Sequence, residues 1–536
     1  MGFILVGLAA LTLLVLRLVL ARNRKQLPPG PRGLPILGNV LELATASQIW
    51  LIFDKWKYQY GPIMYLNMAG KNIVVLNTQA AATELLERRS GNYSDRPKNV
   101  VAEYLGSQLS MPFARYGKPW QSMRRAGHAV LNARVSTQYQ PVQIEEAIIL
   151  AHDLICDTSS PLLTKINRSA STIISVIYGK ESLSLDWRVQ LPSKFTDTSD
   201  ELHITPDPLE TLGNVAHRFT NALYPGAYLV DVLPILDYLP ATIAKWKKDA
   251  QKDFSRISAI FETYYDDAMR NDQNRSSLCV SLAEDQVAEG LSDVEKAWVA
   301  GSLSVAALET TSTTLMLFLY AMVLHPNVQQ HAQRELDRVI GRSRCPTFAD
   351  MPELPYLRAI VKEVLRWQPA IPLAVPHTAI EDDWYEGYFI PKGTACIPNV
   401  WSMNRDKDIY GLDADQFRPE RFLQKSEKGA ASVLRQEYEV DDGHCAYGFG
   451  RRVCLGRHVA DNALFIDICM ILWALCIEPE TSTGPLAKQR PSKDILIAHG
   501  TLSSIPDFQC RFLPRFPEAE GIMQNLRDEL GGNIAT

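Results

Sequence analysis

One cysteine stands in a loop of glycines and arginines that leads directly into a long apolar segment. Residues 447–456 read Tyr-Gly-Phe-Gly-Arg-Arg-Val-Cys-Leu-Gly, and the apolar run Val459–Ile477 is long enough for a helix. A thiolate is a strong, soft metal ligand. Glycines let the backbone approach a flat cofactor and aim N–H groups at the sulfur, while arginines pair with carboxylates. Cys454 is therefore a candidate axial ligand of a haem iron.

Other interpretations of this loop have to be weighed against a haem site. A lone cysteine is often a small buried apolar residue, and a glycine-rich loop before a helix can bind phosphate. The Lys-Ser/Thr pair of a phosphate loop does not follow here. A zinc site would use His444, Cys445, Cys454 and His458, but their spacing lacks the closely paired ligands of common zinc modules. We rank haem above zinc, and zinc above a purely structural loop.

The N-terminal residues predict a membrane anchor. Residues 3–20 are apolar except for Thr12 and Arg17, and basic residues follow at once in 22–25. A spanning helix needs roughly 17–25 apolar residues, and basic residues after the span place the following chain in the cytosol. We expect residues 1–21 to be a transmembrane signal anchor in the endoplasmic reticulum membrane, and 22–45 a basic stop and proline-rich hinge. The nine scattered cysteines suit a reducing compartment for the rest.

Helical periodicity dominates the remaining chain and predicts a mainly α protein with small β-sheets (α+β). No repeat or linker divides residues 46–515, so we expect one domain there, followed by a polar, loose tail at 516–536. Helices are expected at Gln48–Tyr60, Thr78–Arg89, Trp120–Leu131, Val142–Cys156, Ile166–Tyr178, Gln251–Arg270, Val294–Leu324, Val328–Ile340, Tyr356–Trp367 and Val459–Ile477. Strands are expected at Ile63–Met68, Asn72–Asn77, Tyr388–Ile390 and Thr394–Ile397, with a hairpin turn between the last two.

The segment Val294–Leu324 poses both a structural and a chemical question. From Trp298 onward its only charged residue is Glu309, so it is either a long helix in the protein core or a second membrane span. A carboxylate near the middle of a span is costly in lipid, which favours the core helix. Thr310 follows Glu309, and an acid beside a hydroxyl in an apolar wall can relay protons. The bland alternative is that these hydroxyls only fill a contact between helices.

A second group of charged residues predicts a buried structural network. Glu363 and Arg366 are three residues apart and therefore share one helix face. The residues that flank them are apolar, which indicates a buried pair that needs a further partner. The segment Phe417–Phe422, Phe-Arg-Pro-Glu-Arg-Phe, offers Arg421.

Together these motifs resemble those of the cytochrome P-450 superfamily. Its haem-binding signature is F-x-x-G-x-R-x-C-x-G, which Gly450, Arg452, Cys454 and Gly456 match, with Tyr447 in the place of the Phe. Its E-x-x-R pair and P-E-R-F box match the triad described above, which in this family locks the core around the haem loop. The resemblance implies the P-450 fold across residues 28 to 456.

The resemblance also implies a haem b cofactor and roles for several residues. Residues 306–311 are similar to the family's oxygen-activation motif, A-G-x-E/D-T-T, so Glu309 and Thr310 are the implied catalytic pair. Ala307 stands where the family usually has glycine. The family motif W-x-x-x-R matches Trp120 and Arg124, which would pack beside a haem propionate and pair with it. Further propionate partners are expected from His377 and Arg452.

By the same resemblance, we expect a monooxygenase that inserts one oxygen atom from O2 into a lipophilic small molecule. A terpenoid, polyketide-derived or aromatic substrate fits, as in fungal secondary metabolism, with electrons from a separate flavin-containing NADPH reductase. The alternatives are a haem-thiolate isomerase or dehydratase that needs no O2, and a non-enzymatic membrane protein with a zinc loop. The net charge of −5, without a basic stripe, gives no indication of nucleic-acid binding.

Overall fold

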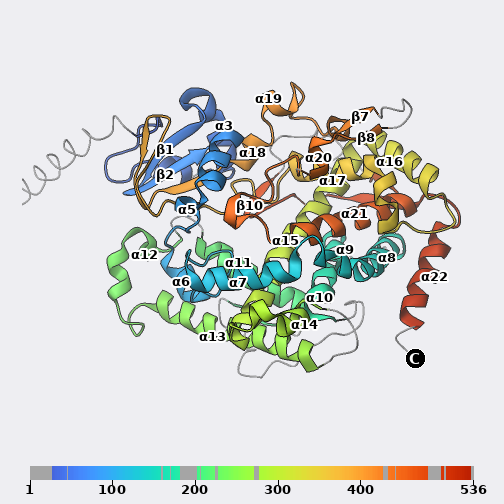
Figure 1. Cartoon of the computed structure of the whole chain (residues 1–536), viewed down its shortest axis with the longest axis horizontal. Helices are drawn as coiled ribbons and strands as arrows, with labels where there is room; N and C mark the ends of the chain where they lie inside the picture. Colours follow the sequence, from blue (N-terminus) through green and yellow to red (C-terminus); the bar gives the residue numbers. More distant parts are fainter. Residues whose placement is uncertain are drawn as a thin grey trace, which may run out of the picture.

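The computed structural model describes residues 27–532 apart from 45, 158–160, 170, 181–201, 206, 224–226, 271–276, 426–431, 441, 481–495, 500–501 and 507. The expected anchor at 1–21 lies outside the described residues. Within them helices predominate, and the strands β1 (Ile63–Met68) and β2 (Lys71–Leu76) lie beside α3 (Ile49–Tyr60) on the left of the view in Figure 1. The expected mainly α architecture with small sheets is confirmed.

The longer helices include most of the expected ones, to within a few residues at most ends, and four in segments where the sequence predicted none, at residues 100–106, 208–223, 278–284 and 519–532. They are α3 (Ile49–Tyr60), α6 (Val100–Gly106), α7 (Lys118–Leu131), α8 (Gln140–Cys156), α9 (Leu162–Ser169), α10 (Ser171–Tyr178), α11 (Pro208–Leu223), α13 (Lys245–Arg270), α14 (Leu278–Glu284), α15 (Asp293–Leu324), α16 (Pro326–Val339), α17 (Pro355–Trp367), α21 (Arg457–Ala474) and α22 (Ala519–Gly532). The helix expected at Ile166–Tyr178 is two helices, α9 and α10. The one expected at Thr78–Arg89 becomes α4 (Gln79–Ala82) and a π-helix, η2 (Thr83–Arg88).

Helix α15 is a core helix. A capping box starts it: Ser292 Oγ accepts the Glu295 N–H, and the Glu295 carboxylate accepts the Ser292 N–H. By length and composition, α15 is the only candidate membrane span among the described residues, yet 67% of its most apolar window is buried inside the protein. It runs through the middle of the molecule (Figure 1). The interpretation as a second span is therefore not supported.

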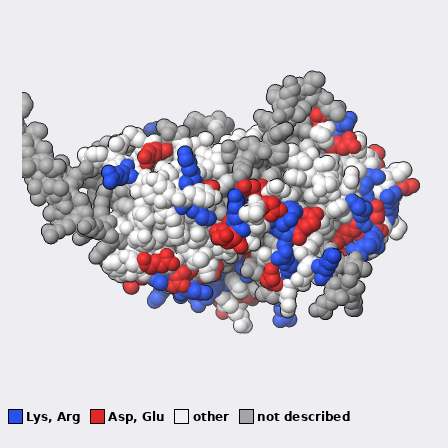
Figure 2. Space-filling model, turned by 90° about the horizontal axis from the view of Figure 1, so that it is seen from above, with Lys and Arg blue, Asp and Glu red and all other residues white. Residues whose placement is uncertain are grey.

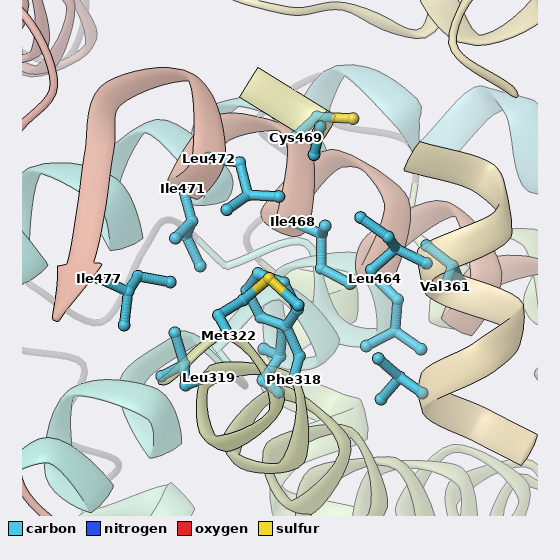
Figure 3. Packing of buried hydrophobic residues seen from close by; sticks show 14 of the residues in the cluster. Phe318, Leu319, Met322, Val361, Leu464, Ile468, Cys469, Ile471, Leu472 and Ile477 are labelled. Carbon is cyan, nitrogen blue, oxygen red and sulfur yellow. The ribbon is translucent and has the colours of Figure 1, made fainter. Parts of the chain in front are cut away.

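The core beneath α15 joins segments that are far apart in the sequence. Figure 3 shows Phe318 and Met322 of α15 facing Leu464 and Ile468 of α21, with Val361 of α17 alongside. These side chains belong to one continuous cluster of buried apolar residues. Burial of a large aliphatic or aromatic side chain stabilises the fold by about 1.5–3 kcal/mol, so this cluster holds α15 and α17 against α21, the helix that follows the cysteine loop.

The main sheet has the order β1-β2-β6-β3, with β1 (Ile63–Met68), β2 (Lys71–Leu76), β6 (Ala395–Pro398) and β3 (His377–Thr378). Strands β1 and β2 are antiparallel, with Ile63 opposite Leu76, and β6 runs parallel to β2. The expected hairpin between β5 (Tyr388–Ile390) and β6 is wrong, because β5 pairs with β4 (Asp383–Tyr385). The turn itself forms, with Thr394 N–H donating to Pro391 O at 3.1 Å, but β6 leaves it to pair with β2.

The C-terminal segment also differs from expectation. The tail predicted to be loose contains α22, which packs against α8 and buries Phe516, Ala519 and Met523 in the main core. Its polar residues occupy the outer face of an amphipathic helix, which made the segment resemble a solvated tail. Helix α21 ends at Ala474, earlier than expected, because β9 (Leu475–Pro479) pairs with β12 (Cys510–Pro514) just before α22.

Acidic and basic side chains are intermixed on the face of the molecule that Figure 2 shows. This agrees with the small net charge of −5. A mixed surface of this kind provides no extended single-sign field on that face for a polyanion.

Candidate active site

The cysteine loop is held against its neighbour by a glycine. Gly450 has a φ of +57°, and a Cβ there would lie 2.1 Å from the carbonyl oxygen of Leu86 in η2. The Cys454 N–H donates to the Tyr447 carbonyl oxygen at 2.8 Å, which closes the loop just before α21 begins. Both the backbone conformation and the close approach require glycine at position 450. The position of the thiol thus depends on contact between the loop and η2.

The surroundings of Cys454 both oppose and support a thiolate. Burial raises the pKa of the thiol, whereas the Gly456 N–H and the charge of Arg124 lower it. Arg124 of α7 reaches the loop directly and donates to the Val453 carbonyl oxygen. Although the surrounding protein desolvates the thiol, Cys454 keeps accessible surface, unlike the buried Leu455 beside it, so a ligand can reach the sulfur. A bound metal ion would remove the thiol proton outright.

Tyr447 has a partner that a phenylalanine at this position would lack. Its hydroxyl donates to Asp461 Oδ1 at 2.5 Å, joining the loop to the second turn of α21. Burial raises the pKa of Asp461 to about 7, while the bond from Tyr447 lowers it. The sequence interpretation did not include Asp461, although a carboxylate in the mainly apolar segment that forms α21 was a usable signal. The hydroxyl that tyrosine has and phenylalanine lacks is therefore the group that contacts Asp461.

Three arginines gather beside the loop without a carboxylate of their own. Arg452 donates to the carbonyl oxygens of Ser94, Met111 and Ala114, and its guanidinium lies 3.9 Å from the ring centroid of Trp120. Arg96 donates to the carbonyl oxygens of Pro112, Val375 and Pro376.

The protein balances the charges of these arginines only in part, through the nearby charge of Asp95. Burial lowers the pKa of Arg452 to about 9, and burial together with the charge of Arg452 lowers the pKa of Arg96. Neither of these two arginines, nor Arg124, forms an ion pair with a carboxylate among the described residues. Unpaired buried charges are costly, so the cluster fits an anionic group. Arg96 was not among the predicted site residues, because only the fold brings it to Arg452.

His377 lies in the same region but is not a cation. It is buried in β3, and its Nδ1 lies 2.7 Å from the Tyr93 carbonyl oxygen, which makes Nδ1 the donor. Burial and the nearby charges of Arg96 and Arg452 lower its pKa to about 3. The neutral ring then presents Nε2 as an acceptor. Its expected role as a propionate donor remains a prediction and requires a protonated ring.

Helix α15 supplies the acid–alcohol pair. The Thr310 hydroxyl donates to the Ala306 carbonyl oxygen at 2.9 Å, one turn earlier in the same helix. Burial alone raises the pKa of Glu309 to about 7, so this carboxyl can gain and lose a proton near neutral pH. Ala306 is exposed although it lies in a core helix, as Cys454 is exposed in its loop. Both remain accessible to a ligand.

The resemblance to the cytochrome P-450 superfamily implies a substrate pocket between α15, the loop from Asp95 to Lys118 and the segments after residues 367 and 499, and the last two segments meet α15. Thr313 of α15 donates to the Ser503 carbonyl oxygen at 3.4 Å, and the Ser503 N–H donates to the Ala370 carbonyl oxygen at 2.9 Å. The regions after residues 367 and 499 therefore lie against α15. By the same resemblance, the expected lining residues are Val305 and Ala306 of α15 together with Ile371, Leu373, Val375 and Leu502.

The expected Glu–Arg–Arg triad is present and fully engaged. Glu363 and Arg366 are both 0% exposed and form a two-pronged ion pair at 2.6 and 2.8 Å. Arg421 Nε lies 3.1 Å from both oxygens of Glu363. The network reaches the cysteine loop through Asn404, whose carbonyl oxygen accepts from Arg366 and whose side-chain oxygen accepts from the Cys445 N–H.

The zinc interpretation finds no support in the described part of the chain. It contains no group of three or more His, Cys, Asp or Glu side chains arranged to hold a metal ion. His444 accepts the Ala446 N–H at its own Nδ1, and burial lowers its pKa to about 3. Cys454 therefore offers a single thiolate to a metal, as an axial ligand does.

The comparison with known proteins agrees with this geometry. The family model described as cytochrome P450 matches residues 28–502, and the chain belongs to that family. Cytochrome P450 monooxygenases of Armillaria gallica and of Postia placenta are each 41% identical to it, over 95% and 98% of the chain and 93% and 95% of their own lengths. One of Amanita muscaria is 38% identical over 95% of the chain and 94% of its length. The chain is accordingly an oxygen-incorporating oxidoreductase.

The residues present fit the haem iron that this family carries. Cys454 supplies an accessible sulfur, and Arg96, Arg124 and Arg452 supply buried positive charge for carboxylates. A Cβ at Gly456 would meet no protein atom within 4 Å, so packing within the protein does not account for this glycine. A flat group placed against the backbone would account for it.

Replacing Glu363 by alanine should prevent haem incorporation. The change leaves two guanidinium groups buried without their carboxylate, which costs roughly 3–5 kcal/mol. Haem content per purified chain measures the effect. The control is Arg270→Ala, which removes one partner of an exposed pair with Asp266 and should leave haem content unchanged. A Glu363→Ala protein with full haem content would contradict the assigned role of the triad.

Proposed function

We propose that this protein is a haem-thiolate monooxygenase that inserts one oxygen atom from O2 into a lipophilic small molecule. The observation that supports this best is the pairing of an accessible Cys454, surrounded by cationic side chains, with Glu309 and Thr310 on a helix packed against the same core. A terpenoid, polyketide-derived or aromatic compound suits the mainly apolar residues expected around Ala306. The similarity to fungal monooxygenases supports the reaction class, and we assign the protein to secondary metabolism on the resemblance of its motifs alone.

Each group of residues has a separate task in this proposal. Haem, when bound through Cys454, supplies the iron chemistry that activates O2. Trp120, Arg124 and Arg452 hold the carboxylates of the cofactor, and the triad keeps the loop in place. Glu309 holds a proton close to neutral pH and delivers it with Thr310. The bond from Thr310 to Ala306 shows that the hydroxyl can also engage the helix backbone when it is not donating elsewhere.

A haem-thiolate isomerase or dehydratase is the second candidate. Ala307 favours it, because the methyl group stands where the family usually has glycine beside the oxygen site. Glu309 argues against it, since an acid that titrates near neutral pH is suited to proton delivery during oxygen activation. The two activities differ in whether molecular oxygen enters the product.

Electrons would come from a separate NADPH-dependent flavin reductase. The surface near the cysteine loop supports this, because Arg125 of α7 and Arg451 are exposed there, with Arg457 at the start of α21. Contact between Arg124 and Val453 joins α7 to the loop, so these cations share one region. Cations around a redox centre raise the association rate of an acidic partner.

We further propose that the protein is anchored in the endoplasmic reticulum membrane with the catalytic domain in the cytosol. The apolar residues 3–20 support this proposal. Further support comes from exposed apolar side chains in residues 34–41 and in and after α12 (Leu229–Val232). These are Leu34, Ile36, Leu37, Leu41, Leu229, Leu233, Ile235 and Ile243. Apolar surface of this kind is typical of contact with a membrane or a partner.

Under 18O2, a product made by the purified protein with the reductase should gain one labelled oxygen atom. Substrates would be sought in a panel of terpenoid, polyketide and aromatic compounds, with mass spectrometry as the measurement. Product formation should require both NADPH and O2, and Glu309→Gln should lower the rate by about 100-fold, the lower range for a proton-transfer group. A product formed without O2 would instead support the isomerase or dehydratase.

Reversing the charge of Arg125 and Arg451 should weaken reductase coupling. The double Glu variant should need about tenfold more reductase for half-maximal NADPH oxidation, because steering commonly contributes about that factor. The effect should shrink at high ionic strength. Arg270→Glu, at the end of α13, serves as the matched charge change. An unchanged reductase requirement in the double variant would exclude this docking region.

A further inference from the structure

A histidine from another helix faces the acid of α15. His217 lies on α11, and its Nε2 is 3.6 Å from Glu309 Oε1. The His217 side chain is 60% exposed, whereas that of Glu309 is only 21% exposed. The pair therefore connects a solvent-accessible ring to a largely buried carboxyl. The distance is slightly longer than a hydrogen bond, so a small ring rotation or one bridging water completes the contact.

The rotation of α11 that presents His217 to Glu309 is fixed by its neighbour. Arg218 is buried and pairs with Asp253 of α13 at 2.7 Å, and it also donates to the Tyr228 hydroxyl at 3.0 Å. Successive residues on a helix point about 100° apart. Anchoring Arg218 toward α13 therefore holds His217 on the side that faces α15, which packs against α11.

Other charged groups on the elements around α11 are directed elsewhere. Glu103 of α6 pairs with Arg115 at 3.7 Å, and the Tyr104 hydroxyl donates to Asp237. Arg218 and Asp253 pair with each other. Burial alone accounts for the raised pKa of Glu309, without a contribution from these groups. Among the described residues, His217 is the titratable side chain placed to exchange a proton with Glu309.

We propose that His217 is the outer proton donor of the active site and protonates the Glu309 carboxylate again between turnovers. In this step the N–H bond at Nε2 breaks, an O–H bond forms at Glu309 Oε1, and the neutral ring takes another proton from solvent. No electron moves. Histidine suits the task because it is the side-chain type that commonly changes charge near neutral pH. The inference rests on the proposed function, since it assigns the proton source for the Glu309–Thr310 pair.

The first test follows the protonation of Glu309 directly and needs no turnover. The carboxyl band of Glu309 is identified by infrared difference against Glu309→Gln, and its titration is compared between wild type and His217→Gln. A protonated ring stabilises the nearby carboxylate, so its removal should raise the apparent pKa of Glu309 by about one unit. The control is His203→Gln, which changes an exposed histidine in the segment before α11 and should leave the titration unchanged.

The second test measures proton delivery with reductase, NADPH and O2. His217→Gln should raise the share of consumed O2 released as hydrogen peroxide by about threefold, with haem content unchanged. His217→Lys keeps a positive charge but gives up its proton less readily, so it should not restore the wild-type share. His203→Gln should match wild type.

The two tests separate the possible failures. An unshifted Glu309 titration, or a wild-type peroxide share in His217→Gln, would overturn the proton-donor role. Restoration by His217→Lys would also overturn it, because charge alone would then suffice. If wild-type protein loaded with haem oxidises no NADPH, the monooxygenase proposal fails, and the infrared titration still decides whether His217 is linked to Glu309.

Discussion

The buried ion network around Glu363 is the interaction on which the active site depends. Its carboxylate is shared by Arg366 and Arg421, and the remaining donors of both arginines end on backbone carbonyl oxygens of residues 404–416. These carbonyls belong to a segment that is irregular apart from the short helix α19 (Lys407–Tyr410). The network therefore holds this segment in place, and the Asn404 side chain connects it to Cys445, just before the cysteine loop. Each nitrogen of the two guanidinium groups has a partner, which is the condition under which buried charge is tolerated.

A second buried charge cluster has the opposite character. Arg96 and Arg452 are bound to carbonyl oxygens rather than to carboxylates, and burial lowers the pKa of both. Positive charge that forms no ion pair among the described residues therefore lies near Cys454. Carboxylates of a bound cofactor would neutralise this charge, so cofactor binding and folding should reinforce each other. Tyr447 and Asp461 add a polar contact between the same loop and α21.

The sequence was a good guide wherever structure depends on neighbouring residues. Helix α15 was predictable from its apolar length and its capping residues, and Glu363 with Arg366 from their spacing in apolar surroundings. Contacts between distant segments were harder to predict. The turn at Pro391–Thr394 forms as expected, but the partner of β6 is β2, more than 300 residues earlier, and local pattern does not encode that choice.

The same limit explains which site residues were missed. Arg96, Asp461 and His217 are ordinary polar residues in their local sequence, and their roles arise only when the fold brings them to Arg452, Tyr447 and Glu309. The polar residues of α22 led to the expectation of a loose tail, whereas the segment forms a helix whose Met523 is fully buried against the core. In each case the missing information was the identity of a partner from another part of the chain.

The central claim is that Cys454 binds haem iron as a thiolate, and the spectrum of the reduced protein with carbon monoxide tests it most directly. The purified wild-type protein should show the long-wavelength band from which the cytochrome P450 family takes its name. Cys454→Ser should lose that band while the triad and the arginines remain intact. A wild-type protein that binds haem but lacks the band, or a Cys454→Ser variant that keeps it, would contradict the assignment of the thiolate ligand.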